Sequence, residues 1–204
     1  LPIRYRPDPD TPGHPHCPVL LSPKHEIRDA PKPDRLEPAQ AAVRQNSRWQ
    51  RARGLFTTLK GNIAATYGLV EATGIAAGLG MATRTLVPRA MARLRDRLSA
   101  GTAVARHLWP RVSHTPATPK RDDTGMLLDE QVFYAQAMFA LTGLGAPYGR
   151  LLVICGHGST TTNNPYAAAL DCGACGGRRG GPNARVMAGI LNAPDVRTRL
   201  AERG

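Results

Sequence analysis

Three of the chain's four cysteines and one of its six histidines lie in the segment CGHGSTTTNNPYAAALDCGACGG, residues 155–177. His157 follows a short apolar run, Cys172 comes fifteen residues later, and Cys175 has CxxC spacing from Cys172. Thiolate sulfur and imidazole nitrogen are ligands that zinc prefers in proteins. Zinc (Zn2+) binding by His157 and a cysteine such as Cys172 is therefore one hypothesis for this segment. Two ligands do not complete the site, because zinc takes four protein ligands, or three and a water.

The same residue types also fit a redox role or a purely structural one. A CxxC pair such as Cys172 and Cys175 occurs in thiol redox proteins, where it normally opens a helix after a strand. The sequence CGACGGRRGG has too many glycines to begin such a helix. A cysteine can also be a small buried apolar residue without chemistry. Cys17, His14 and His16 are additional candidate ligands, but their spacing does not support the assignment.

The elements around this segment indicate how it is positioned. Leu151–Cys155 is a continuous apolar run bounded by turn residues, which is typical of a strand buried in a parallel sheet. A helix precedes it at residues 129–142, and another is predicted at 183–192. This alternation predicts the α/β class with an open, mainly parallel sheet, in which ligands bind beyond the carboxyl ends of strands. The segment with His157 begins at that position.

A second feature follows in GGRRGGPNARVMAGIL, residues 176–191. Pro182 suits the first turn of a helix, and the free N–H groups of a helix N-terminus attract anions. Arg178, Arg179 and Arg185 lie close by in sequence. The segment therefore indicates either an anion site or simply a basic loop.

The chain divides into three parts by composition. Residues 1–37 are Pro-rich and irregular, with a short strand expected at Cys17–Pro23. Residues 38–121 are a helical insertion, first apolar and then basic, and residues 122–204 are the α/β half with the zinc ligands. Within the insertion, Gly61–Pro88 carries little charge and many small residues. It predicts a buried, tightly packed helix or helix pair, with a membrane span as the alternative.

The positive charge of the chain limits the classes of partner that it can bind. Net charge is +12, and residues 84–121 hold nine Lys or Arg against one acidic residue, Asp96. Such a surface suits nucleic acid, an anionic membrane, small anions or an acidic protein. Aromatic residues make up only 5% of the chain and no nucleic-acid recognition motif is present, so we expect no nucleic acid as partner. A basic nucleic-acid-binding module with a structural zinc is kept as an alternative function, as is a thiol redox protein.

The number of cysteines and the two ends of the chain indicate its cellular compartment and its completeness. Four cysteines in 204 residues are not a disulfide framework, and the N-terminus lacks the apolar core of a signal peptide. We therefore expect a reducing, cytoplasmic setting. The chain begins with Leu1 rather than Met, and its last ten residues are typical of a helix. We expect it to be a piece of a longer protein.

The string CGHGSTTTNNPYAAALDCGACGG…GGPNARVMAGILN, together with PIRYRP and CPVLLSP near the start, resembles the DabA family. DabA proteins are the large soluble subunits of energy-coupled inorganic carbon transporters. The match is strong over residues 151–203 and fair over 1–28. The long string is far more specific than an isolated CxxC.

The resemblance implies a fold related to β-carbonic anhydrases, with zinc held by Cys, Asp, His and Cys. His157 matches the family's histidine ligand and Cys172 its second cysteine, whereas no ligand role is carried over to Cys175. The other two ligands, and an Asp–Arg pair that gates catalysis, come in the family from a Cys-x-Asp-x-Arg motif that is expected upstream of Leu1. Zinc would activate water to add to CO2, yielding bicarbonate.

The resemblance also implies a partner and a location. The partner is a membrane-embedded, ion-translocating subunit (DabB-like), which would make CO2 hydration one-way and accumulate bicarbonate. Carbonic-anhydrase-like activity is expected only in the full-length complex. The protein would lie peripherally on the cytoplasmic face of the cell (inner) membrane. Gly61–Thr83 and the basic residues 84–121 are the candidates for docking on that partner or on the anionic bilayer face.

Overall fold

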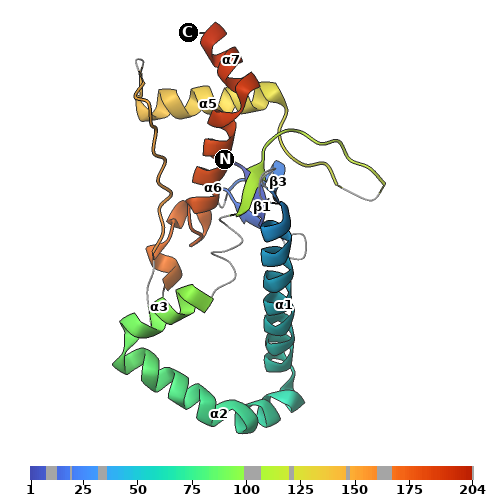
Figure 1. Cartoon of the computed structure of the whole chain (residues 1–204), viewed down its shortest axis with the longest axis vertical. Coiled ribbons are helices and arrows are strands. Elements are labelled where there is room, and N and C mark those ends of the chain that lie inside the picture. The colour runs from blue at the N-terminus through green and yellow to red at the C-terminus, as the bar shows by residue number, and fades with distance from the viewer. Residues whose placement is uncertain are drawn as a thin grey trace. The chain divides into compact units, whose positions relative to one another are not determined.

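The computed structural model describes residues 1–7, 13–18, 20–31, 36–98, 107–119, 122–145, 148–159 and 167–203 (Figure 1). The chain divides into two compact units. The first comprises the described residues of 1–30, 109–159 and 166–204, and the second those of 31–108. The first unit holds the candidate metal ligands.

The sheet is four-stranded and mixed, with the strand order β2-β1-β3-β4. Its strands are β1 (Ile3–Arg6), β2 (His14–His16), β3 (His25–Pro31) and β4 (Leu108–Arg111). β1 pairs antiparallel with β2 and parallel with β3, so that Ile3 lies opposite His16 on one side and His25 on the other. Ile3 and Tyr5 are buried while Arg4 between them is exposed. This alternation is the two-residue period of a strand with one buried face.

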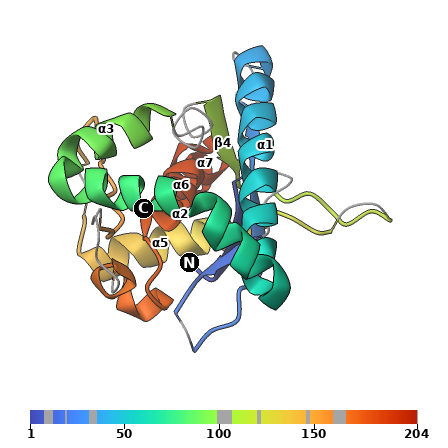
Figure 2. The same cartoon turned by 90° about the horizontal axis from the view of Figure 1, so that it is seen from below.

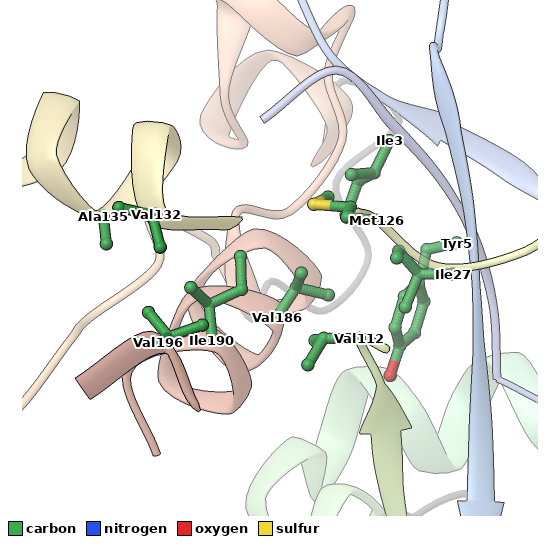
Figure 3. Packing of buried hydrophobic residues seen from close by; sticks show 10 residues of the cluster. All are labelled: Ile3, Tyr5, Ile27, Val112, Met126, Val132, Ala135, Val186, Ile190 and Val196. Atoms are coloured by element: carbon green, nitrogen blue, oxygen red, sulfur yellow. The ribbon is translucent and has the colours of Figure 1, made fainter. Parts of the chain in front are cut away.

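Three helices of the first unit pack against one another: α5 (Leu128–Thr142), α6 (Gly181–Asn192) and α7 (Pro194–Glu202). Figure 3 shows their apolar side chains meeting those of the strands in one cluster. The cluster consists of Ile3, Tyr5, Ile27, Val112, Met126, Val132, Ala135, Val186, Ile190 and Val196. Each fully buried Val or Ile contributes about 1.5–3 kcal/mol, so this core fixes α6 against the sheet.

The ends of α5 are determined locally. The Glu130 side chain accepts a hydrogen bond from the backbone N–H of Leu127 at 3.1 Å, which satisfies one free donor at the start of the helix. Gly143 ends the helix in the left-handed conformation at φ 68°, where glycine carries no Cβ penalty. The helix predicted at residues 129–142 is confirmed as α5. Val132 and Ala135 on this helix are buried, whereas Leu141 is 88% exposed.

The second unit contains three helices: α1 (Leu36–Gly61), α2 (Ile63–Leu86) and α3 (Pro88–Leu98) (Figure 2). The carboxamide oxygen of Asn62 accepts from the Ala65 backbone N–H at 3.1 Å and caps α2. Pro88 begins α3, since its missing N–H is not needed in a first turn. α2 and α3 and most of α1 fall within the part predicted to be helical, residues 38–121, but the same range also holds the strand β4.

The prediction that Gly61–Pro88 is buried is wrong. Tyr67, Ile75 and Leu86 on α2 are 76%, 84% and 79% exposed. A Cβ added at Gly68, Gly74 or Gly78 would meet nothing within 4 Å, so these three glycines serve no close packing in the described part of the chain. Among the described helices, none combines the length and apolarity needed to cross a membrane.

The strand predictions need correction. Leu151–Cys155 forms no strand, and Leu151 and Val153 are 81% and 69% exposed. Cys17–Pro23 is not the predicted strand either, because Leu21 donates to the Pro18 carbonyl in a turn at 2.8 Å. A strand needs a neighbour to pair with its backbone groups, and an apolar run does not reveal one. The sheet instead forms largely from the Pro-rich N-terminal part, and it is mixed rather than mainly parallel.

The remaining helix predictions agree with the structure. The helix predicted at 183–192 is α6, which begins at Gly181 with Pro182 in its first turn. The helical pattern of the last ten residues corresponds to α7.

His25, the first residue of β3, is a buried titratable group that contacts α5. Its Nε2 lies 3.4 Å from the Tyr134 hydroxyl, and the two rings meet edge to face at 5.9 Å between centroids. Its Nδ1 is 3.8 Å from a Glu130 carboxylate oxygen. Burial lowers the pKa of His25, and Glu130 opposes this only in part.

A lowered histidine pKa predicts a pH-dependent stability. Because the unfolded state takes up the proton first, the free energy of unfolding should fall as pH drops below about 6.5 toward the lower folded pKa. In urea unfolding between about pH 7.5 and 5, we expect His25→Gln to flatten this decline. An unchanged slope in the variant would contradict the assignment.

Candidate metal site

Backbone contacts bring the His157 loop and the Cys172 turn together in the first unit. The Ser159 N–H donates to Asp171 Oδ1 at 2.7 Å. Ser159 lies two residues after His157, and Asp171 lies one residue before Cys172. On the other side, the Gly180 N–H donates to the His157 carbonyl at 2.6 Å. The loop around His157 is therefore bonded at both ends of the segment that carries Cys172. The two predicted ligands lie in one loop cluster, although no strand leads into it.

Glycines make this close approach possible. A Cβ added at Gly156 would lie 2.3 Å from the Gly180 carbonyl carbon, and one added at Gly180 would lie 2.9 Å from the His157 nitrogen. Real side chains do not occupy such distances, so the backbone of 156–157 touches the start of α6 only because both positions lack a side chain. The glycines around His157 are visible in the sequence, whereas their contact with Gly180 is not.

Cys172 and Cys175 flank a single turn. The Cys175 and Gly177 N–H groups both donate to the Cys172 carbonyl, at 3.1 and 3.0 Å, around the 3₁₀ helix η3 (Gly173–Cys175). A backbone bridge with an N–O distance of 3.2 Å joins Cys172 to Arg178 and closes the loop. Gly176 and Gly177 adopt left-handed φ values of 65° and 74°, which disfavour any other residue.

The turn lowers the pKa of Cys172. The causes are the nearby backbone N–H groups of Cys175 and Ala174 and the thiol of Cys175, which favour the thiolate. Burial and the neighbouring Cys172 sulfur raise the pKa of Cys175. The turn thus favours a thiolate at Cys172, which is the form that binds a metal. This observation distinguishes the two cysteines, which sequence spacing did not.

Asp171 is a site residue that sequence reasoning missed. Its side chain is 13% exposed; one carboxylate oxygen holds the Ser159 N–H and the other lies 3.9 Å from Arg179 Nε. Asp171 therefore connects the His157 loop to the Cys172 turn, because it directly precedes Cys172 in the chain. The only sequence signal was an acidic residue adjacent to a candidate ligand.

The donor set in the described residues is incomplete. His157 is exposed at the surface of the loop. Within the described ranges, no group of three or more His, Cys, Asp or Glu side chains is arranged to hold a metal. Imidazole and thiolate suit zinc, and the N–H groups around the Cys172 sulfur support that chemistry. Zinc binding by His157 and Cys172 therefore stays a prediction.

The other candidate ligands have different surroundings. Cys17 is buried and donates to the Leu21 carbonyl at 3.2 Å. It still lies near enough to Cys175 to affect it electrostatically. His14 and His16 are in β2, and burial lowers the pKa of His16. Cys155, not singled out from sequence, is exposed.

A polar network anchors α6 to the sheet. Arg185 Nη1 donates to the Tyr5 hydroxyl at 2.7 Å and to Asp29 Oδ2 at 3.2 Å, and the Tyr5 hydroxyl donates to Asp29 Oδ1 at 2.7 Å. Burial raises the pKa of Asp29, and the Arg185 charge opposes that increase. Asn183 adds a hydrogen bond from its side-chain amide to the His16 carbonyl at 3.0 Å.

This network changes the interpretation of the basic loop. Arg185 is committed to Tyr5 and Asp29, which the anion-site alternative did not anticipate. Arg179 instead interacts with Asp171, at 3.9 Å. The network fixes the first turn of α6, and through Gly180 it fixes the His157 loop.

Comparison with known proteins identifies the family. The family model described as "Probable inorganic carbon transporter subunit DabA" matches residues 1–204. A protein of that description from Novosphingobium aromaticivorans is 42% identical over 207 residues, covering 100% of this chain and 24% of the relative. Those from Salinibacter ruber and Haloarcula marismortui are 41% and 40% identical, each over 92% of this chain. No solved structure matches the chain.

These matches define the class first: the relatives are probable subunits of inorganic carbon transporters. Within that class, the chain belongs to the DabA family. The resemblance inferred from the sequence is thereby confirmed. The chain spans about a quarter of the length of the curated relatives it matches.

The close approach at Gly156 yields a prediction. In the full-length protein, Gly156→Ala should lower the free energy of unfolding by about 1–3 kcal/mol, because the new methyl overlaps the Gly180 backbone. It should also reduce zinc per chain, measured by elemental analysis, since the His157 loop must move. Gly173→Ala is the matched control: its Cβ meets nothing within 4 Å, and we expect a change of about 0.5 kcal/mol or less. Equal effects of the two variants would contradict this account.

Proposed function

We propose that this chain forms part of the zinc-binding subunit of an inorganic carbon transporter, which couples CO2 hydration to bicarbonate accumulation with a membrane partner. The observation that carries the proposal is the joining of the His157 loop to the Cys172 turn through hydrogen bonds of Asp171 and Gly180. Membership of the DabA family supports the transported substrate class.

His157 and Cys172 supply a nitrogen and a sulfur ligand in this proposal. The turn stabilises the Cys172 thiolate before metal arrives, because two nearby backbone N–H groups and the Cys175 thiol favour it. Asp171 and Gly180 hold the His157 loop in place from opposite sides. Zinc, when bound, supplies the Lewis acidity that activates water for addition to CO2. The remaining two ligands come, by the family resemblance, from a Cys-x-Asp-x-Arg motif elsewhere in the full-length protein.

The ligand assignment is tested by His157→Ala in the full-length protein, expressed with its partner. Zinc per chain should fall from about one to near zero, because zinc needs at least three protein ligands. Bicarbonate accumulation should be lost with it. His114→Ala is the control, since His114 pairs with Asp123 at 2.9 Å, a contact that involves none of the predicted ligands. Normal zinc and normal uptake in His157→Ala would overturn the assignment.

A docking surface on the second unit supports the membrane partner. α2 exposes apolar side chains along its length, and α3 carries Arg89 and Arg93 at its surface. Met91 and Leu94 follow Val87 at helical spacing, which makes α3 a basic amphipathic helix. We place the contact with the membrane subunit and the cytoplasmic bilayer face on this surface, with the protein bound peripherally.

Charge removal tests this surface. In the full-length protein, Arg89→Gln with Arg93→Gln should shift protein from the membrane fraction to the soluble fraction, because each basic residue near an anionic surface contributes about 1 kcal/mol. Arg197→Gln with Arg199→Gln on α7 removes the same charge from another exposed helix and should leave the distribution unchanged. Equal membrane retention by both double variants would remove α3 from the docking surface.

A further inference from the structure

The CxxC turn has the geometry of a disulfide. The Cys175 N–H bonds to the Cys172 carbonyl at 3.1 Å, and such a turn brings the two Cα atoms within about 7 Å of each other. Disulfides bridge Cα atoms about 4.4–6.8 Å apart. Joining the two sulfur atoms therefore requires little movement of the backbone.

The other two cysteines are less suited to this reaction. Cys155 is exposed on the His157 loop, and all four cysteines are free thiols. Cys17 lies near Cys175 but is buried, with its thiol donating to the Leu21 carbonyl at 3.2 Å. Cys172 and Cys175 are both half-buried and therefore partly accessible to a small oxidant. The local geometry favours the pair within the turn.

The surrounding residues allow the turn to adjust. Gly173 begins η3 with open space where its Cβ would be, and Gly176 and Gly177 follow Cys175 with left-handed backbone. These glycines tolerate the small changes in dihedral angle that a new bond demands. The glycine content that argued against a helix-opening redox motif is thus compatible with a disulfide inside a turn.

We propose that Cys172 and Cys175 form a reversible disulfide that withdraws the Cys172 sulfur from the metal site under oxidising conditions. The oxidant is a low-molecular-weight disulfide such as oxidised glutathione. The Cys172 thiolate attacks one sulfur of that disulfide, forming a mixed disulfide and releasing one thiol. The Cys175 thiolate then attacks the Cys172 sulfur and releases the second thiol, so that two protein thiols are oxidised and one external disulfide is reduced to two thiols.

The consequence for zinc rests on the proposed function, whereas the disulfide itself does not. A sulfur in a disulfide is no longer a thiolate, and zinc binds thiolates. Oxidation therefore removes one ligand of the proposed site, and reduction restores it. In this role Cys175 needs no contact with the metal.

The experiment uses the full-length, zinc-loaded protein in glutathione mixtures from fully reduced to fully oxidised. After alkylation and digestion, mass spectrometry should show the peptide with residues 172–175 without alkyl groups in the oxidised mixtures. Its mass should be two hydrogens below that of the free dithiol, and dithiothreitol should reverse this. Zinc released to a chromogenic chelator should rise in step with the disulfide. Cys175→Ser and Cys175→Ala should retain zinc when reduced, and in the oxidised mixtures they should stop at a glutathione adduct on Cys172 instead of forming the internal disulfide. Cys17→Ser is the matched control and should behave like the wild type.

Three results would overturn the inference: a Cys17–Cys175 bond in place of the predicted one, a stable glutathione adduct on wild-type Cys172, or an internal disulfide that forms only after zinc is chelated. A reduced wild-type protein without zinc is a different result. It would contradict the proposed function, while the peptide masses would still decide whether Cys172 and Cys175 pair.

Discussion

The backbone of Gly156 and His157 lies directly against the start of α6, and the candidate site depends on this contact. The Gly180 N–H bonds to the His157 carbonyl at 2.6 Å, at a separation that leaves no room for a side chain at position 156 or 180. Because α6 is buried through Val186 and Ile190, the contact transmits the rigidity of the core to an otherwise exposed loop. The loop needs this support, since no strand holds it.

Charge in the first unit is arranged around the same helix. Arg185 is held by the buried Asp29 carboxylate and the Tyr5 hydroxyl, which ties the first turns of α6 to β1 and β3. The Cys172 thiolate is favoured by backbone N–H groups within its own turn, so the donor properties of the sulfur depend on local backbone conformation. The residues that anchor α6 are thus different from those that lower the pKa of Cys172.

In the second unit, large apolar residues of α2 are exposed, among them Ile75 at 84% and Leu79 at 64%. Leaving apolar area in water forgoes about 25 cal/mol per Å² of stabilisation, so a helix of this kind is expected to be covered in the working assembly. The basic face of α3 fits an anionic surface.

The sequence alone determined the helices and the family, because helical periodicity, Pro and Gly at helix ends, and a long specific string are local properties. The resemblance of that string to the family also selected His157 and Cys172 as predicted ligands. The sequence could not determine that Leu151–Cys155 lacks a pairing strand, that α2 is exposed, or that the Pro-rich start supplies the sheet. Those outcomes depend on which distant segments meet. Only the tertiary structure therefore decided that Asp171 and Gly180 hold the His157 loop, and that Arg185 bonds to Asp29 and Tyr5.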